Sequence, residues 1–263
     1  MTVVDSLRPS PNLRVLVTAG GAGIGAAIAR AFHEAGARVH VCDLDRSALD
    51  RLTHEVPGIT SSMADASVPG DVDLVFDDIE RSLGGLDVLV NNAGIAGPTG
   101  PIESIDEAGW TRTMDVNLNS QYYFARRAVP LLKQSRANPV LIAMGSVAGR
   151  LAYPFRTPYA STKWAIVGLA KSLAVELGRH GVRVIPILPG TVEGKRLDSV
   201  ISARAASLGV SVEAVREQYL DKISLRRMVT ADDVAAMALF LCSPAARNVT
   251  GQAISVDGNV EYL

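Results

Sequence analysis

A tyrosine and a lysine four residues apart follow a serine, and these three side chains together could transfer a proton. Tyr159 and Lys163 occupy positions i and i+4, which share one helix face, so their phenol and ammonium groups can converge. Ser146 comes just after an apolar run at 140–144 that is typical of a strand. A free tyrosine phenol titrates near ~10, and a neighbouring ammonium stabilises the phenolate. The spacing predicts a proton-transfer site where a strand end meets a helix start, although an isolated Tyr-x-x-x-Lys is also typical of a surface helix.

A glycine-rich stretch near the N-terminus has the pattern of a phosphate-binding loop. A β-branched run at 13–18 enters the stretch 19–25, and residues of helical character follow at 26–32. Strand, glycine turn and helix in this order direct free backbone N–H groups at a phosphate. The next strand, 38–43, ends in Asp43, whose carboxylate can accept hydrogen bonds from both adenosine ribose hydroxyls and would repel a 2′-phosphate. The sequence therefore predicts NAD rather than NADP, with an ordinary turn residue as the alternative for Asp43.

Strand-like and helical segments alternate along the rest of the chain. Further strands are expected at 59–63, 86–90, 140–144, 182–187 and 253–258, and helices at 47–56, 72–83, 110–132, 159–177, 193–227 and 231–241. This alternation predicts the α/β class, as a single Rossmann-type doubly wound domain with about seven parallel strands flanked by helices on both faces. We expect a flexible arm at 1–12 and a single NAD-binding catalytic domain at 13–263.

Composition limits the classes of partner. The chain has 263 residues, 48% hydrophobic and 20% charged, and its formal net charge of −1 gives no electrostatic reason to expect nucleic acid or a membrane surface. No apolar run approaches the ~20 residues of a membrane span, and 1–12 lacks the apolar core of a secretory signal. Two distant cysteines favour buried thiols in a reducing cytoplasm. No metal is expected, because no ligand spacing relates the histidines, His33, His40, His54 and His180.

Ordered motifs over most of the chain resemble the classical short-chain dehydrogenase/reductase family. The stretch 18–25 matches the family's Thr-Gly-x-x-x-Gly-x-Gly loop, except that Ala19 replaces the first glycine and would be strained if its φ were positive. Asn-Asn-Ala-Gly at 91–94, Pro-Gly at 189–190 and the C-terminal signature at 250–258 also match. The family's catalytic tetrad falls on Asn117, Ser146, Tyr159 and Lys163.

The resemblance implies a role for each matched residue. Tyr159 would be the general acid/base, Ser146 would hold the substrate oxygen, Lys163 would also hold the nicotinamide ribose, and Asn117 would hold a water that links Lys163 to solvent. The predicted cofactor contacts are Ala19, Gly20, Gly21, Ala22, Gly23, Ile24, Gly25, Asp43, Leu44, Asp65, Ala66, Asn92, Ala93, Gly94, Tyr159, Lys163, Pro189, Gly190 and Val192. The predicted substrate contacts are Ser146, Tyr153, Arg156, Tyr159 and Glu193. Three of these predictions have a structural alternative. Asp65 could be an ordinary loop aspartate, Asn92 could only stabilise a turn, and Val192 could be a core residue.

The segment 193–227 lies outside the alternation and, by the same resemblance, covers the substrate. The cations of this segment could simply form the solvent-exposed face of a helix. Alternatively, one or two of them, or Arg150 or Arg156, could bind an anionic group of the substrate. The cations of the segment are Lys195, Arg196, Arg204, Arg216, Lys222, Arg226 and Arg227.

The predicted function is NAD-dependent interconversion of a secondary alcohol and a ketone by hydride transfer, on a small-molecule substrate. The alternative is a non-catalytic dinucleotide-binding sensor or scaffold on the same fold. The family's usual assembly implies a homotetramer, or a homodimer.

Overall fold

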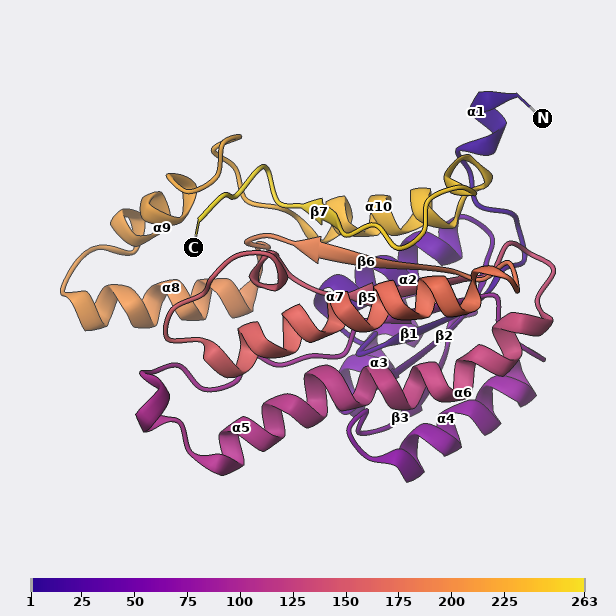
Figure 1. Ribbon diagram of the computed structural model, residues 1–263, viewed down its shortest axis with the longest axis horizontal. Helices are drawn as coiled ribbons and strands as arrows, with labels where there is room; N and C mark the ends of the chain where they lie inside the picture. The colour runs from indigo at the N-terminus through magenta and orange to yellow at the C-terminus, as the bar shows by residue number, and fades with distance from the viewer. Residues whose placement is uncertain (1, 263) are drawn as a thin grey trace.

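The protein, described by a computed structural model over residues 2–262, is built around one seven-stranded parallel sheet (Figure 1). The side chains of Lys195, Arg196, Ala203, Arg204 and Ser207 lie outside the described part, so three of the candidate cations do too. The strand order is β3-β2-β1-β4-β5-β6-β7. The strands are β1 (Arg14–Thr18), β2 (Arg38–Asp43), β3 (Thr60–Met63), β4 (Val88–Asn91), β5 (Val140–Met144), β6 (Arg183–Pro189) and β7 (Ile254–Val256).

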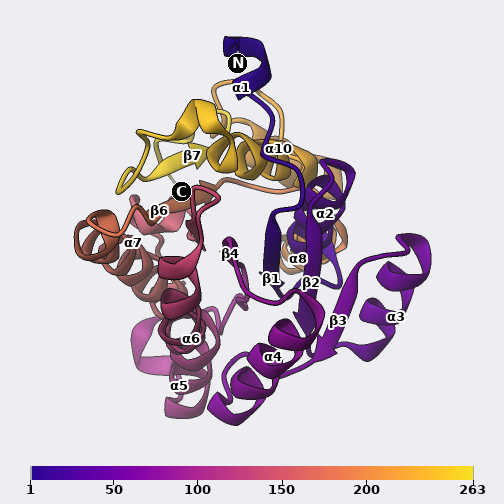
Figure 2. The same cartoon turned by 90° about the vertical axis from the view of Figure 1, so that its right-hand side faces the viewer.

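Helices cover both faces of the sheet, which confirms the predicted doubly wound α/β fold (Figure 2). One core layer joins α2, α3 and α10 to one face, and a second joins α4, α6 and α7 to the other. The helices are α1 (Val3–Ser6), α2 (Gly23–Glu34), α3 (Arg46–Glu55), α4 (Pro69–Ser82), α5 (Glu107–Met114), α6 (Ser120–Gln134), α7 (Thr157–Gly178), α8 (Lys195–Leu208), α9 (Val212–Leu220) and α10 (Ala231–Cys242). None of the helices within residues 2–262 combines the length and the apolar character that a bilayer span requires.

The strand order reverses between β1 and β4, and this reversal fixes where a site can form. From β1 the chain proceeds outward to β2 and β3, then returns to place β4 on the other side of β1. In such sheets the helices leave opposite faces at the reversal, so a crevice opens at the carboxyl ends of the strands. Thr18 and Asn91, the last residues of β1 and β4, mark this crevice.

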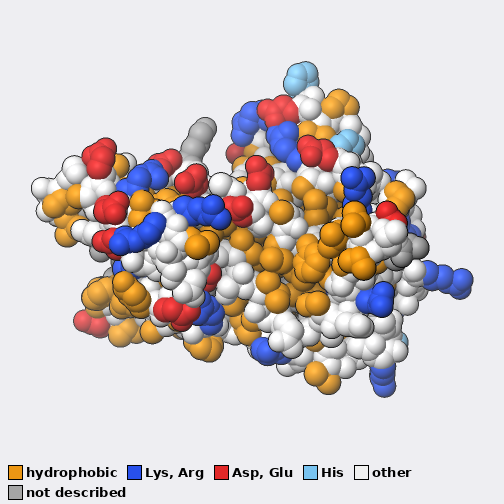
Figure 3. Space-filling model, turned by 90° about the horizontal axis from the view of Figure 1, so that it is seen from above, with side chains coloured by type: hydrophobic (Ala, Val, Ile, Leu, Met, Phe, Trp, Pro, Cys, Tyr) orange, Lys and Arg blue, Asp and Glu red, His pale blue; other side chains and the backbone are white. Residues whose placement is uncertain are grey.

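Two helical predictions need correction. The single helix predicted at 110–132 is α5 and α6 joined through a π-helical turn, Asp115–Asn119. The helical segment predicted at 193–227 is two helices, α8 and α9, because Gly209 takes a left-handed conformation with φ of 65° and ends α8. Charged side chains of both signs gather over this end of the molecule (Figure 3).

A short helix, α1, lies within the N-terminal segment that was predicted to be a flexible arm. A capping box explains it, because the Thr2 hydroxyl accepts from the Asp5 backbone N–H while the Asp5 carboxylate accepts from the Thr2 N–H. None of the residues of α1 is buried.

A buried histidine on β2 makes the stability of the fold depend on pH. The His40 side chain is 2% exposed, with Nδ1 2.8 Å from Thr60 Oγ1 and Nε2 2.9 Å from Ser62 Oγ. The Ser62 hydroxyl donates in turn to the Asp78 carboxylate. Burial lowers the pKa of His40 from 6.5 to about 4.

We expect the free energy of unfolding to fall as the pH drops from 6.5 toward 4. Over this range the unfolded chain binds a proton at His40 that the folded chain does not, which costs about 3 kcal/mol once the pH is below the folded value. Urea denaturation at pH 7.5, 5.5 and 4.5 measures it. His40→Gln keeps hydrogen-bonding groups without titrating, so most of the loss between pH 6.5 and 4 should disappear. An equal loss in both proteins would contradict the assignment.

Candidate active site

The glycine loop connects β1 to α2 and leaves the start of that helix open. Ala22 is the N-cap of α2, yet its side chain makes no capping hydrogen bond, and a Cβ added to Gly23 would meet no atom within 4 Å. Gly25 packs closely, because a Cβ there would lie 2.8 Å from Asn92 Nδ2. The loop therefore presents uncapped backbone N–H groups, which is the arrangement that binds a phosphate.

Ala19 takes the left-handed conformation, with φ of 49°. This conformation costs a non-glycine residue about 1–2 kcal/mol. Ala19, which replaces the glycine of the family's motif, is therefore strained, as predicted for a positive φ. The loop nevertheless forms, since the next residue, Gly20, donates its N–H to Cys42 O at 3.0 Å.

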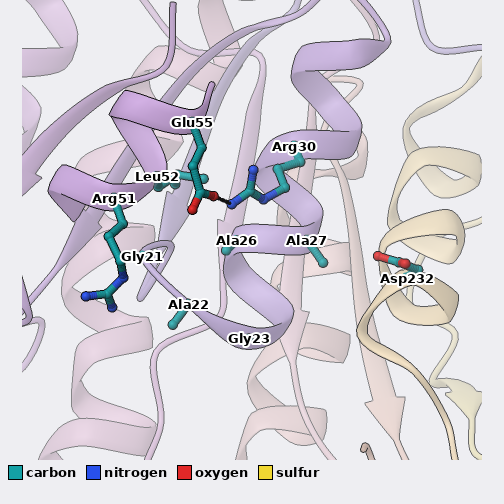
Figure 4. Close-up of a pocket in the computed structure, with 10 residues that line it drawn as sticks. All are labelled: Gly21, Ala22, Gly23, Ala26, Ala27, Arg30, Arg51, Leu52, Glu55 and Asp232. Carbon is teal, nitrogen blue, oxygen red and sulfur yellow. Dashed lines mark hydrogen bonds and ion pairs between the residues drawn. The ribbon is translucent and has the colours of Figure 1, made fainter. Parts of the chain in front are cut away.

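Asp43 lies at the end of β2 and faces the loop. Its Oδ2 accepts from Gly21 N at 2.9 Å and its Oδ1 from Asp45 N at 3.1 Å, while the next side chain, Leu44, is 61% exposed. A pocket of about 350 Å³ adjoins the loop between α2 and α3, and the ion pair of Arg30 and Glu55 lies across it (Figure 4). None of the predicted catalytic residues lines this pocket.

The turn after β4 is tied to the end of β1 by side-chain hydrogen bonds. Asn92 Nδ2 donates to Thr18 O and Ala19 O at 3.0 and 3.1 Å. The Thr18 hydroxyl oxygen accepts from the backbone N–H groups of Asn92 and Ala93 at 2.8 and 2.9 Å. The side chain of Asn92 therefore holds the glycine loop in place. These bonds favour the alternative that the Asn92 amide stabilises a turn.

Asp65 is held by neighbouring donors. Its carboxylate accepts from Ser67 N at 2.9 Å and from Arg112 Nη2 at 3.2 Å. Burial opposes the charge, but the hydrogen bonds of Ser67 and the Arg112 guanidinium keep the pKa of Asp65 below its usual range. Ala66, the next predicted contact, is half-buried. Through Arg112, the Asp65 carboxylate connects α5 to the loop after β3.

Tyr159 and Lys163 lie on the first turns of α7 and converge as their spacing predicts. The Lys163 side chain is 4% exposed, and its Nζ lies 5.6 Å from the centroid of the Tyr159 ring. Nζ donates to Met144 O, the last residue of β5, at 2.9 Å. A buried ammonium is thus fixed between a strand end and the phenol.

Ser146 caps the short 3-10 turn Val147–Gly149 and lies against the same helix. Its Oγ accepts from Ala148 N at 3.2 Å, which leaves the hydroxyl proton for another acceptor. Gly149 permits the close approach, because a Cβ there would lie 2.5 Å from Lys163 O. The turn that carries the serine is therefore packed directly on the helix that carries the tyrosine and the lysine.

Asn117 is fully buried in the π-helical turn and uses its side chain to hold a loop. Its Oδ1 accepts from Ile95 N at 2.7 Å, and its Nδ2 donates to Ile95 O at 3.0 Å and to Thr162 Oγ1 at 3.2 Å. A Cβ on Gly94 would lie 3.3 Å from Asn117 Oδ1 and 3.6 Å from Lys163 Nζ. The loop after β4 thus lies against both residues.

One aromatic ring, that of Tyr153, and an arginine lie beside the phenol. The rings of Tyr153 and Tyr159 meet edge to face, with centroids 6.4 Å apart. The Arg156 guanidinium carbon lies 5.3 Å from the Tyr153 centroid and 5.2 Å from the Tyr159 centroid. Both predicted substrate contacts of this segment therefore adjoin the Tyr159 ring.

The remaining predicted residues surround the end of β6. Gly190 donates its N–H to Val256 O at 2.9 Å, and a Cβ there would lie 2.7 Å from Asp257 Cβ. Val192 pairs with Val229 in an isolated parallel bridge, and Glu193 follows it as an exposed residue.

Arg150 is engaged elsewhere. Its Nη2 lies 2.9 Å from Asp257 Oδ2 and also donates to Val260 O, and its Nη1 lies 3.6 Å from Glu261 Oε2. The hypothesis that it binds an anionic substrate loses support, because these acceptors already neutralise it.

Sequence reasoning missed two threonines that position the site. Thr18 joins the two loops, as described above, and Thr162 Oγ1 links Asn117 Nδ2 to Tyr159 O, to which it donates at 2.7 Å. A hydroxyl at the last position of a buried strand is a signal that could have identified Thr18. For Thr162 the sequence offers only its place beside Lys163.

Comparison with known proteins places this arrangement in a family. Residues 18–260 match the family model described as Enoyl-(Acyl carrier protein) reductase. The chain is 35% identical over 247 residues to L-fucose dehydrogenase of Bos taurus, covering 94% of this chain and 88% of that protein. It is 34% identical over 256 residues to 2-(S)-hydroxypropyl-CoM dehydrogenase 3 of Xanthobacter autotrophicus, covering 96% and 98%.

A solved structure shows the same fold at similar identity. It is 7α-hydroxysteroid dehydrogenase complexed with NADH and 7-oxo glycochenodeoxycholic acid, which is 31% identical, covers 99% of this chain and 98% of that chain, and superposes with a TM-score of 0.88. The glycine loop, the seven-stranded sheet and these similarities together show that the chain belongs to the short-chain dehydrogenase/reductase family.

Proposed function

We propose that the protein interconverts a secondary alcohol and a ketone with NAD as cofactor. The observation that carries this proposal is the buried Lys163 ammonium, bonded to the end of β5 and held against the ring of Tyr159. The loop after β4 and the turn of Ser146 both pack on Lys163. A proton-transfer group, a cation and a hydroxyl donor thus face one crevice of the sheet.

The residues at the crevice fit a dinucleotide. The uncapped N-terminus of α2, with open space at Gly23, suits a pyrophosphate, and the half-buried Asp43 suits a ribose diol. The solved 7α-hydroxysteroid dehydrogenase contains NADH, which supports a nicotinamide cofactor here. We propose further cofactor contacts at Leu44, Asp65, Ala66, Ala93, Gly94, Pro189, Gly190 and Val192.

Each catalytic side chain then has a defined task. A bound nicotinamide would supply the hydride acceptor or donor. Tyr159 removes the hydroxyl proton of the alcohol, and Lys163 stabilises the phenolate that accepts it. Ser146 donates a hydrogen bond from its hydroxyl to the substrate oxygen and stabilises the charge that develops there. A water relay at Asn117 would use the backbone, because its amide is bonded to Ile95 and Thr162.

The preference for NAD should depend on Asp43. We expect Asp43→Asn to lower the ratio of kcat/KM with NAD to that with NADP by about 10- to 100-fold, because the charge that repels a 2′-phosphate is removed. Asparagine retains an oxygen for Gly21 N, whereas Asp43→Ala relaxes the preference and also loses that bond. Steady-state kinetics with both cofactors measure the ratio, and an unchanged ratio in both variants would count against the assignment.

A dinucleotide-binding sensor without catalysis is the competing function. A sensor has no need of a serine, a tyrosine and a buried lysine around one crevice, so the retained set favours an enzyme. Mixing the protein with NAD and a panel of secondary alcohols, and following NADH absorbance, tests this directly. NAD binding without turnover of any alcohol, and without reduction of any ketone by NADH, would favour the sensor.

We also propose a homotetramer, or a homodimer, with the helices around Asn117 and Tyr159 pairing across a two-fold axis. Exposed apolar side chains on α6 and α7 support it: Tyr122 is 50%, Trp164 51% and Val175 86% exposed. Analytical ultracentrifugation gives the oligomeric state. A reducing cytoplasm stays the predicted location.

A further inference from the structure

An arginine beside the catalytic tyrosine has a buried N–H group with no partner. Arg156 Nη2 donates to Ala96 O at 2.9 Å, but Nε is buried and accepted by no atom of the described residues. Within the same part of the chain, no carboxylate lies at ion-pair distance from this guanidinium. A half-buried cation without a carboxylate partner is costly, so the guanidinium as a whole favours an anion that arrives from outside the chain.

The Arg156 guanidinium makes one hydrogen bond within the described residues, from Nη2. The rings of Tyr153 and Tyr159 both lie within 5.3 Å of the guanidinium carbon, and stacking on rings uses the faces of a guanidinium and not its N–H groups. Nη2 already donates to Ala96 O and Nε is buried, so a carboxylate would bind at Nη1, for which the described residues supply no acceptor. Ala96, which holds Nη2, is two residues after Gly94, which lies against Asn117 and Lys163. The guanidinium therefore lies beside the loop that packs on the catalytic residues.

The backbone before this arginine is strained in a way that fixes its position. Phe155 has φ of 63°, a left-handed conformation that is a true outlier for a bulky residue. It persists because Phe155 O accepts from Gly100 N at 2.9 Å, while Arg156 N donates to Tyr153 O at 3.3 Å. Such strain is retained where the surroundings determine the conformation, and it often marks functional sites.

Three other described arginines at or near the insert already have acidic partners. Arg150 is neutralised by Asp257 and Glu261, as shown above. Arg216 Nη2 lies 2.7 Å from Asp198 Oδ1, and Arg226 pairs with Asp221. Arg156 is therefore the cation beside Tyr159 that is available to a substrate anion.

We propose that Arg156 binds a carboxylate of the substrate, which makes the substrate a short hydroxy acid and its product the corresponding keto acid. This deepens the proposed function and rests on it. Because the guanidinium lies beside the ring whose hydroxyl receives the proton, the carboxylate lies within a few bonds of the carbon that reacts. Arg156 thus determines specificity, while Tyr159 transfers the proton.

A matched pair of substrates tests the proposal. 3-Hydroxybutanoate and its methyl ester carry the same secondary alcohol and differ in charge, and the 2- and 4-hydroxy homologues vary the spacing. We expect kcat/KM for the best acid to exceed that for its ester by at least 10-fold. Arg156→Gln should lower kcat/KM for the acid by about 10- to 100-fold, mostly through KM, and change that for the ester by less than about 3-fold.

Two further variants guard against misfolding and indirect effects. Arg156→Lys keeps the charge but lacks the planar guanidinium, so its selectivity should be intermediate. Arg216→Gln removes a guanidinium that is paired with Asp198 on the insert, and its selectivity should equal that of the wild type. Calorimetric titration of 3-hydroxybutanoate into Tyr159→Phe, with and without Arg156→Gln, measures the loss of binding without turnover.

The possible outcomes distinguish failure of the carboxylate site from failure of the proposed dehydrogenase function. Equal rates with acids and esters, unchanged by Arg156→Gln, would overturn the carboxylate site and leave the dehydrogenase intact. Loss of activity on acid and ester alike, with the variant folded by circular dichroism, would make Arg156 a positioning residue and also overturn the proposal. No NADH formation from any alcohol and no ketone reduction would overturn both.

Discussion

Tyr159→Phe should lower kcat by about 10³-fold while the dissociation constant for NAD changes by less than about 3-fold. Removing the phenolic oxygen deletes the group that we propose exchanges a proton with the substrate, and general acid–base catalysis typically contributes 10²- to 10⁴-fold. The ring remains to pack against Tyr153 and Arg156, so the cofactor site should keep its shape. NADH absorbance gives kcat, and calorimetric titration gives the dissociation constant.

Tyr122→Phe is the matched control for this prediction. Tyr122 lies on α6 and is 50% exposed, so loss of its hydroxyl should leave kcat unchanged. A Tyr159→Phe protein that retains most of its rate would refute the role of the phenol. Loss of rate together with loss of NAD binding would show that the substitution disturbs the cofactor site instead.

Lys163→Met should lower kcat by a similar factor and, in contrast, weaken NAD binding by about 10-fold. The substitution keeps an apolar chain of similar length in the buried position but removes the ammonium 5.6 Å from the Tyr159 centroid. At this range a unit charge interacts with a phenolate by about 3 kcal/mol in an effective dielectric of ~20, which accounts for about 10²-fold of the loss in rate. The remainder, and the weaker binding, follow if Lys163 also holds the nicotinamide ribose.

The two measurements on Lys163→Met need a control on the same helix. Lys171 is exposed on α7 and donates to Gly251 O at 3.0 Å, so Lys171→Met removes a lysine at comparable cost without touching the crevice. Its kcat and NAD affinity should match those of the wild type. If Lys163→Met bound NAD normally, the role of the lysine would be limited to the phenol.

The sheet and the order of its elements were predictable because buried parallel strands are short apolar runs with glycine or asparagine at their ends. The strand at 140–144 was predicted with its observed bounds. Errors arose where burial and strand structure differ. Leu86 is fully buried although β4 begins two residues later. It is apolar because it packs in the core, and not because it belongs to the strand.

The features that sequence reasoning could not reach are backbone conformations and long-range contacts. The residues of a π-helical turn keep helical backbone character and need no glycine or proline, so the turn at Asp115–Asn119 was not distinguished from a continuous helix. The left-handed conformation of Phe155 contradicts local preference and is imposed by its bond to Gly100. The partner of Arg150, Asp257, is 107 residues away in the chain, and only the folded sheet brings them together.

For the site, residue types and spacing identified the convergence of Tyr159 and Lys163, because one helix carries both. They did not show that Asn117 and Asn92 use their amides to fix loops, since those bonds depend on where the turns after β1 and β4 meet. Nor did they separate Arg156, which faces the tyrosine, from Arg150, which faces the C-terminal segment. The relative placement of two residues on one helix can be predicted from the sequence. The contacts between residues on different elements can be found only from the folded structure.

A crystal structure with NAD and a secondary alcohol bound would test the central claim most directly. We predict that the alcohol oxygen lies about 2.6–3.2 Å from both Tyr159 Oη and Ser146 Oγ, with Lys163 still beside the phenol. An alcohol whose oxygen contacts neither hydroxyl, while NAD occupies the crevice at the carboxyl ends of the strands, would contradict the account.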